Sequence, residues 1–233
     1  MDEIKAKAII DKIFFQIFGA PSPYSLDEIL INFAFDLKLP QKVQDSITGE
    51  ETWSESINGT KFITQKNMEK HDGVKGWMLP KREVKTLKEL LNIWQTINYI
   101  TTERQYDCID VAQCDPIYRS EKCFRSTDCT ECKQIVFCDG CHRSEFMLAS
   151  QRTVDSGFCI RVDDSGSCSN SYHVTCSKQI SNSLFIQDCG NLHECIFCSH
   201  ISNRKYCIAN MQFEETEYFS IKKAIIQWIL RKK

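Results

Sequence analysis

Apolar residues follow a helical period in the first and last parts of the chain. The spacing predicts a helix over residues 6–17, a second over 26–37, a third over 87–97 and a closing helix over 221–229. Capping-box patterns begin the second and third of these helices. Residues 42–85 mix short apolar runs with turn residues, which predicts short hairpins. The apolar stripe of each helix indicates packing against a core.

Residues 108–207 follow a different period, of three. All fourteen cysteines lie in this segment, and thirteen of them have residue numbers divisible by three, with Cys176 as the exception. The 34 positions of this phase hold those thirteen cysteines, nine serines, ten Val, Ile, Leu or Met residues, Thr153 and Arg204. An α-helix has about 3.6 residues per turn and a strand alternates at every second residue, so neither produces this pattern. The phase predicts a tight β-solenoid in which every third side chain points into the lumen.

A seven-residue unit recurs on top of this phase, for example at residues 132–138 and 180–186, and successive units are offset by three, four or five triplets. The offsets predict a coil of about 12 residues with insertions of whole triplets, and about eight coils in a rod roughly 40 Å long. We therefore expect an α+β N-terminal cap over residues 1–105, an all-β narrow β-solenoid over 106–212 and a C-terminal capping helix over 213–233.

The repeat resembles the 12-residue right-handed β-helix of insect antifreeze proteins, whose inward positions also fall at every third residue. The chain lacks their regular outward Thr-x-Thr array, so ice binding is not implied. Residues 203–219 resemble the closing signature of cysteine-repeat proteins found in candidate-phyla bacteria and in tailed phages. Those proteins often begin with a zinc-ribbon-like CxxC segment, which is absent here because the first cysteine is Cys108. This resemblance implies a solenoid fold and a phage or phage-like origin, and it implies no activity.

The chemical state of the cysteines stays open at this point. Two CxxC pairs, Cys129/Cys132 and Cys138/Cys141, are the best candidates for a zinc tetrad. Only five residues separate the pairs, and the same phase elsewhere holds Ser, Ile and Val, which cannot replace a thiolate ligand. Cysteines six residues apart would form disulfides across the lumen in an oxidising milieu, and would remain small apolar side chains in a reducing one. We expect no cofactor and no bound metal.

No residue pattern predicts an active site. A nucleophilic cysteine must be exposed and lie beside a base, whereas cysteines of this phase should face a lumen too narrow for a substrate. Asp163 and Asp164 are similar to the acid clusters of polysaccharide lyases, but those enzymes need wide coils, and Asp-Asp-Ser-Gly favours a turn. We therefore predict that the protein is not an enzyme and has no small-molecule substrate.

An aromatic residue precedes the closing inward residue of each seven-residue unit. We expect stacked coils to align these residues into one ladder along the rod, which would form a partner-binding surface. The seven residues are Phe137, Phe146, Phe158, His173, Phe185, Phe197 and Tyr206. The alternative is that the terminal helices lie on the ladder and bury it.

Charge and composition narrow the classes of function. The formal net charge is −2 with acidic and basic residues interspersed, so we expect neither nucleic acid nor a membrane as a partner. No apolar stretch approaches the ~18 residues of a membrane span and no secretory signal begins the chain, which favours the cytoplasm, or a virion if the gene is phage-borne. The prediction is a non-enzymatic structural or protein-binding scaffold that binds a protein partner or itself, as a phage virion or assembly component would. The alternative is a zinc-binding regulatory module that uses the CxxC pairs.

Overall fold

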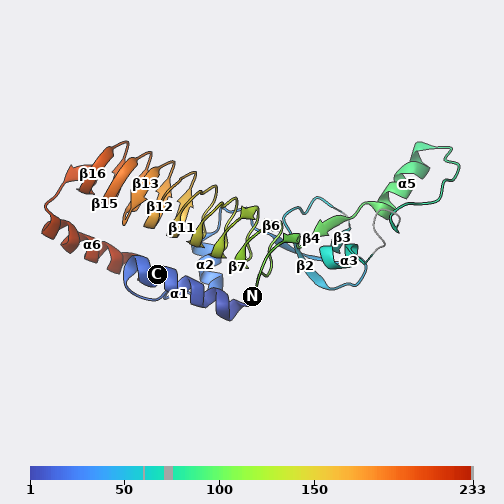
Figure 1. Cartoon of the computed structure of the whole chain (residues 1–233), viewed down its shortest axis with the longest axis horizontal. Helices are drawn as coiled ribbons and strands as arrows, with labels where there is room; N and C mark the ends of the chain where they lie inside the picture. Colours follow the sequence, from blue (N-terminus) through green and yellow to red (C-terminus); the bar gives the residue numbers. More distant parts are fainter. Residues whose placement is uncertain (60, 71–75, 232–233) are drawn as a thin grey trace.

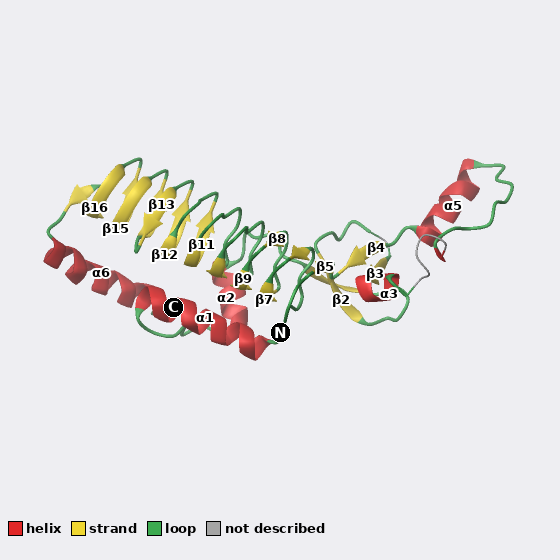
Figure 2. Cartoon of the chain, viewed as in Figure 1, coloured by secondary structure: helices red, strands yellow, loops and turns green. Residues whose placement is uncertain are grey.

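The computed structural model describes residues 1–59, 61–70 and 76–231. It contains a rod, a layer of helices along one side of the rod, and a smaller α/β segment at one end (Figure 1). The rod is the β-solenoid that the period of three predicts, so this fold prediction is confirmed. Figure 2 shows its short strands stacked in parallel beside the helices.

Every coil of the rod has the same length. In each parallel strand pair of the rod, the paired residues are 12 apart in the sequence, which is four triplets. This holds from Gln105↔Ile117 at one end to Ile196↔Ile208 at the other. The strands are β5 (Gln105–Tyr106), β6 (Ile117–Tyr118), β7 (Glu121–Phe124), β8 (Cys129–Thr130), β9 (Lys133–Val136), β10 (Glu145–Leu148), β11 (Gly157–Asp163), β12 (Ser169–Thr175), β13 (Lys178–Ser181), β14 (Leu184–Gln187), β15 (Gly190–Ser199) and β16 (Ser202–Ile208). The short β17 (Met211–Gln212) folds back antiparallel on β16 and closes the last coil.

This constant register corrects two details of the sequence prediction. The rod has about nine coils, not eight, and no triplet is inserted between Gln105 and Ile208. The seven-residue units have uneven offsets because they lie on different sides of the coil.

The period of three has its origin in the backbone. From Asp107 to Ala209, every third residue has a left-handed φ between 44° and 62°, except Pro116, whose ring excludes it. Each coil therefore has four sides, and each side consists of an inward residue, an outward residue and a corner residue. β-branched side chains tolerate a positive φ least, and no Val, Ile or Thr occupies any of these corners.

Serine and cysteine suit the lumen because they satisfy buried backbone groups. Ser126 donates its hydroxyl to the Phe124 carbonyl at 3.0 Å and accepts the N–H of Cys138, in the next coil, at 3.1 Å. The Cys138 thiol donates in the same way to the Val136 carbonyl at 3.4 Å. Both residue types are small, so they fit where two sides of the coil face each other closely.

The predicted helices at the two ends of the chain pack along the rod. They are α1 (Glu3–Phe18), α2 (Leu26–Phe33) and α6 (Glu215–Ile229). Gly19 ends α1 with a φ of 76°, and Ser25 begins α2 with the predicted capping box. The helix α2 ends at Phe33, one turn before the predicted end at Leu37. Its last carbonyl, of Phe33, accepts a hydrogen bond from Arg161 of the rod at 2.6 Å, and the chain turns there.

The end segment precedes the rod in sequence. Its elements are β1 (Gln41–Gln44), β2 (Glu51–Ser54), β3 (Phe62–Thr64), α3 (Gln65–Met68), α5 (Leu87–Ile97) and β4 (Ile100–Thr102). The strands β1 and β2 form a predicted hairpin, whereas β3 pairs in parallel with β4, so a hairpin is the wrong prediction for β3. Residues 71–75 of the predicted hairpin region lie outside the described residues. The predicted third helix is α5, which projects from this segment as an arm (Figure 1).

Two buried carboxylates hold the end segment together. Burial alone would raise the pKa of Asp45, but its hydrogen bonds with Thr64, Asn67 and neighbouring backbone N–H groups lower that pKa to about 2. Asp115, in the first coil, accepts the backbone N–H of Glu55 at 2.9 Å and the side-chain Nε–H of Arg104 at 2.7 Å. Asp115 therefore joins the end segment to the rod.

Candidate interaction surface

One side of the coil is apolar on its outer surface, and we call it the apolar side. Its outward positions recur once per coil at Ala112, Phe124, Val136, Leu148, Ile160, Tyr172, Leu184, Ile196 and Ile208. All but Ala112 and Tyr172 are buried, and they form one core with α1, α2 and α6. Sequence reasoning missed this surface, although the recurrence of an apolar residue at every twelfth position was a signal for it.

Ion pairs fix the helices on both edges of the apolar side. On one edge Arg161 binds the Asp36 carboxylate with two hydrogen bonds, of 2.6 and 2.9 Å, and this pairing lowers the pKa of Asp36. On the other edge Lys222 of α6 binds Glu194 at 2.5 Å and donates to the Asn182 carbonyl at 3.0 Å. The helix layer is therefore bound to the rod by both apolar and ionic contacts.

The seven predicted ladder residues lie on two corner columns, so the prediction of a single ladder was wrong. Phe137, His173, Phe185 and Phe197 lie on one column, and Phe146, Phe158 and Tyr206 lie on the other. The two columns are the two edges of the apolar side. A unit offset of three or five triplets moves the aromatic residue to a neighbouring corner, because one coil consists of four triplets.

Helices cover the second column. Phe146 and Phe158 stack with ring centroids 4.2 Å apart, and Lys12 of α1 lies 4.1 Å above the Phe146 ring. Tyr206 packs against Tyr218 of α6, with ring centroids 5.4 Å apart. The alternative prediction, in which terminal helices lie on these aromatic residues, is confirmed for this column.

The first column is covered only in part. Phe137 is buried, and the Phe185 ring lies 6.2 Å from Trp228 of α6 and 4.6 Å from Phe197. Phe197 is 45% exposed and Trp228 is 56% exposed. His173 also lies at the surface, and partial burial, together with the charge of Arg161, lowers its pKa.

A groove of about 310 Å³ opens beside this column, between α2, the end of α6 and the rod. Tyr172 and Phe185 line it from the rod, Asn32 and Phe33 from α2, and Trp228 and Arg231 from the end of α6. We call this the aromatic groove. Aromatic rings beside amide and guanidinium groups in one groove are typical of sites that bind a ligand or a protein partner through an apolar anchor.

The cysteines of the predicted zinc tetrad point into the lumen and are buried. Burial raises the pKa of Cys129 and Cys138, and the Cys141 sulfur accepts a hydrogen bond from the Thr153 hydroxyl at 3.1 Å. In residues 1–59, 61–70 and 76–231, no group of three or more His, Cys, Asp or Glu side chains lies in an arrangement that could hold a metal ion.

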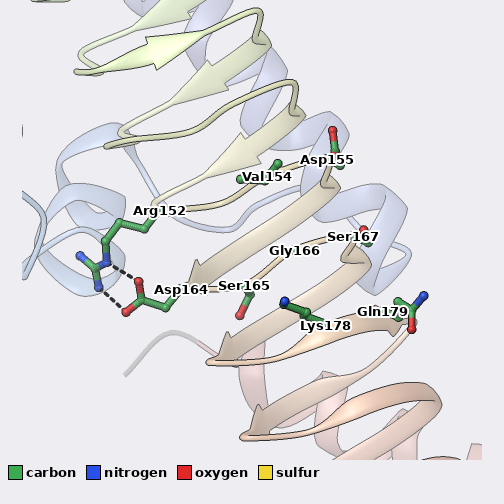
Figure 3. Close-up of a pocket in the computed structure, with 9 residues that line it drawn as sticks. All are labelled: Arg152, Val154, Asp155, Asp164, Ser165, Gly166, Ser167, Lys178 and Gln179. Atoms are coloured by element: carbon green, nitrogen blue, oxygen red, sulfur yellow. Dashed lines mark hydrogen bonds and ion pairs between the residues drawn. The ribbon is translucent and has the colours of Figure 1, made fainter.

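A polar hollow lies on the side of the rod that the helices leave bare (Figure 3). It measures about 660 Å³ and is lined by residues of three consecutive coils around Gly166, including Lys178 and Asp155. Asp164, at a corner, pairs with Arg152 through two hydrogen bonds of 2.6 and 2.9 Å, which lower the pKa of Asp164. Arg152 also binds Asp163 at 2.5 Å, so this acidic pair holds an arginine of the preceding coil.

A serine, a histidine and an aspartate also meet near the last coil. Ser199 Oγ lies 2.6 Å from His200 Nδ1, and His200 Nε2 lies 3.7 Å from Asp188. His200 and Asp188 are exposed, and neither lines any of the pockets described above. A nucleophile activated there would face bulk water, so this arrangement favours a surface hydrogen-bond network.

Comparison of the chain with protein-family models, with curated proteins and with solved structures gave no match. None of the helices among the described residues is long and apolar enough to cross a membrane. Function is therefore inferred from the geometry of the molecule.

Proposed function

We propose that this protein is a non-enzymatic scaffold, a rigid rod that binds a protein partner or a second copy of itself at the aromatic groove. The observation that carries the proposal is the aromatic cluster in which Phe185 and Trp228 line the groove and Phe197 stacks beside Phe185, with Phe197 and Trp228 exposed. Aromatic residues dominate the binding energy of protein interfaces, because they bury a large area and lose little conformational entropy.

The rod is a suitable support for such a surface. Its lumen is filled by buried side chains, and its hydrogen-bond register continues without interruption over about nine coils. An anchor on this backbone is held in position before a partner arrives, which lowers the entropic cost of association.

Site-specific photo-crosslinking tests the proposal. A photoreactive phenylalanine analogue replaces Phe197 in the whole protein, and the matched control carries it at Ser169, which is exposed on another side of the rod. We expect position 197 to yield one discrete crosslinked species, either a dimer or a single partner protein, and position 169 to yield none. Equal products from both positions, or none from position 197, would overturn the proposal.

The resemblance of residues 203–219 to proteins of tailed phages supports a narrower form of the proposal, in which the rod is a virion or assembly component. Antibody labelling of purified particles by electron microscopy would test it. Label restricted to free protein would contradict a virion role.

A further inference from the structure

The arm that carries α5 presents an apolar face to solvent. Leu87, Leu90, Leu91 and Trp94 are spaced at i, i+3, i+4 and i+7, so they lie on one face of the helix. Their exposed fractions lie between 51% and 71%, and no residue of α5 is buried. In Figures 1 and 2 the helix extends beyond the end of the rod, far from α1, α2 and α6.

The segment that leads into α5 continues this surface and adds positive charge. Met78, Leu79 and Val84 are exposed. Four cations, Lys81, Arg82, Lys85 and Lys88, accompany two acids, Glu83 and Glu89, and all six are exposed. Four cations against two acids give the arm a net positive charge, and Lys85 approaches Glu83 only at 4.0 Å, so this charge is available to an anionic surface.

We infer that the arm, residues 76–98, binds the surface of an anionic membrane, with the apolar face of α5 in the headgroup region. This inference goes beyond the proposed scaffold function and does not depend on it. An amphipathic helix with leucines and a tryptophan on one face and flanking cations is the pattern that partitions into such interfaces. Tryptophan favours this depth because its ring is apolar while its N–H still reaches water.

The size of α5 favours a membrane over a second copy of the chain. The helix has 11 residues and is therefore about 16 Å long. Two such faces, each of four apolar side chains, bury less than the roughly 1,200 Å² of a stable protein interface. A lipid interface instead covers all the exposed apolar groups of the arm at once, and it stabilises a helix that is marginal in water at this length.

The expectation of no membrane partner rested on a balanced net charge and on the lack of a spanning segment. Neither observation applies to a helix that lies in the lipid–water interface. Such a helix does not span the bilayer, and it is attracted by the local charge of the arm and not by the net charge of the chain.

Flotation of the whole protein with vesicles tests the inference. The probes are phosphatidylcholine vesicles with about 30% phosphatidylglycerol and vesicles of phosphatidylcholine alone. We expect wild-type protein to float with the anionic vesicles. The Leu91→Gln/Trp94→Gln variant should lose at least about tenfold in affinity, because two apolar side chains no longer partition. The Lys81→Gln/Arg82→Gln variant should bind more weakly and with less dependence on salt.

The matched control is Phe15→Gln, which replaces an exposed aromatic residue of α1 and should float as wild type does. The inference is overturned if wild-type protein stays unbound, or if the Leu91→Gln/Trp94→Gln variant binds equally well. Loss of a dimer in that variant without vesicle binding would assign the arm to a second copy and would also overturn it. Crosslinking at Phe197 reports separately on the scaffold proposal, so failure of one is distinguishable from failure of the other.

Discussion

Inward serines of the rod each join two coils. Ser183 donates to the Ser181 carbonyl at 2.8 Å and accepts the N–H of Cys195 at 3.0 Å. The same double role recurs at Ser126, Ser150 and Ser177. These serines are structural because both of their hydrogen bonds replace water that the lumen excludes.

Replacing Ser183 with alanine should therefore destabilise the protein. The N–H of Cys195 would lose its acceptor in a buried site, at a cost of about 1–3 kcal/mol in the free energy of unfolding. Ser169→Ala, at an exposed outward position, is the control and should change this free energy by less than about 0.5 kcal/mol. Denaturant unfolding measures both, and equal effects would contradict the role of the inward hydroxyl.

Corner residues should accept or reject substitutions according to backbone conformation. Gln179 is exposed and has a φ of 57°, so Gln179→Val should cost about 1–2 kcal/mol, whereas Gln179→Gly should be neutral or stabilising. Lys178→Val, at the neighbouring outward position in β13, should be tolerated because valine favours a strand. Thermal melting of the three variants tests this order. A tolerated valine at position 179 would show that the corner is not left-handed.

Buried thiols should make the protein sensitive to alkali. Burial raises the pKa of Cys114 to about 12 and that of Cys168 to about 11, whereas the pKa of an unfolded thiol is about 8.5. The folded state binds these protons more tightly than the unfolded state does, so the two thiols stabilise the fold. This stabilisation is fully present below the unfolded pKa. It is lost as the pH rises towards the folded values, by up to about 1.4 kcal/mol per pH unit for each thiol.

Denaturant unfolding between pH 8 and 11 measures this loss of stability. The control is the Cys114→Ser/Cys168→Ser variant. Its lysines and tyrosines titrate as they do in the wild-type protein, but it lacks the two thiols. We expect a shallower decline in the variant. An identical decline would mean that these thiols are not buried in the neutral form.

At the scale of the strands, the register determines which surface each residue occupies. A single residue inserted after Gly190 would turn the following inward positions out of the lumen. Three inserted residues would keep the inward phase but move Ile196 and Ile208 away from the apolar side. Duplication of a complete coil, residues 178–189, would preserve both relations.

We therefore expect melting temperature to fall most for the one-residue insertion, less for the three-residue insertion and least for the duplicated coil. Equal stability of the first two would contradict the inward phase. Equal stability of the last two would show that contacts between the apolar side and the helices contribute little.

Arg204 shows how the end of the rod differs from its interior. It is the one charged residue at the 34 inward positions, and it lies exposed in β16, in the last coil. Together with Lys205 it places two cations on a strand that has no further coil beyond it. Charges on an edge strand oppose uncontrolled pairing with other chains.

For the whole molecule, the helix layer covers the apolar side of the rod, as the second sheet of a β-sandwich covers the first. Deletion of residues 213–233 would uncover Leu184, Ile196 and Ile208, which form one core with α6. We expect the truncated protein to aggregate, as measured by light scattering and by binding of an apolar dye. The control is Gln227→Ala, at an exposed position of α6, which should remain monodisperse. A soluble truncated rod would show that the apolar side tolerates water.

The period of three was readable from the sequence because it reflects a local property of the backbone. Because every third residue is left-handed, the side chains of one phase all point into the lumen. That phase is therefore occupied by Cys, Ser and aliphatic residues, and the sequence shows it directly. The helices were equally readable where caps are local, as at Ser25 and Thr86. The end of α2 was not, because it depends on Arg161, which lies far away in the chain.

By itself, the sequence determined the solenoid, its coil length and the residue types of the lumen, since all of these follow from repeated local geometry. The tertiary structure decided which outward residues meet the helices. The apolar residue at every twelfth position marked one side, but how α1, α2 and α6 lie on that side followed only from packing, which buries Phe146 and leaves Phe197 at the surface. It also decided that α5 stands apart, because an amphipathic stripe has the same sequence pattern whether it packs on a core or faces a partner.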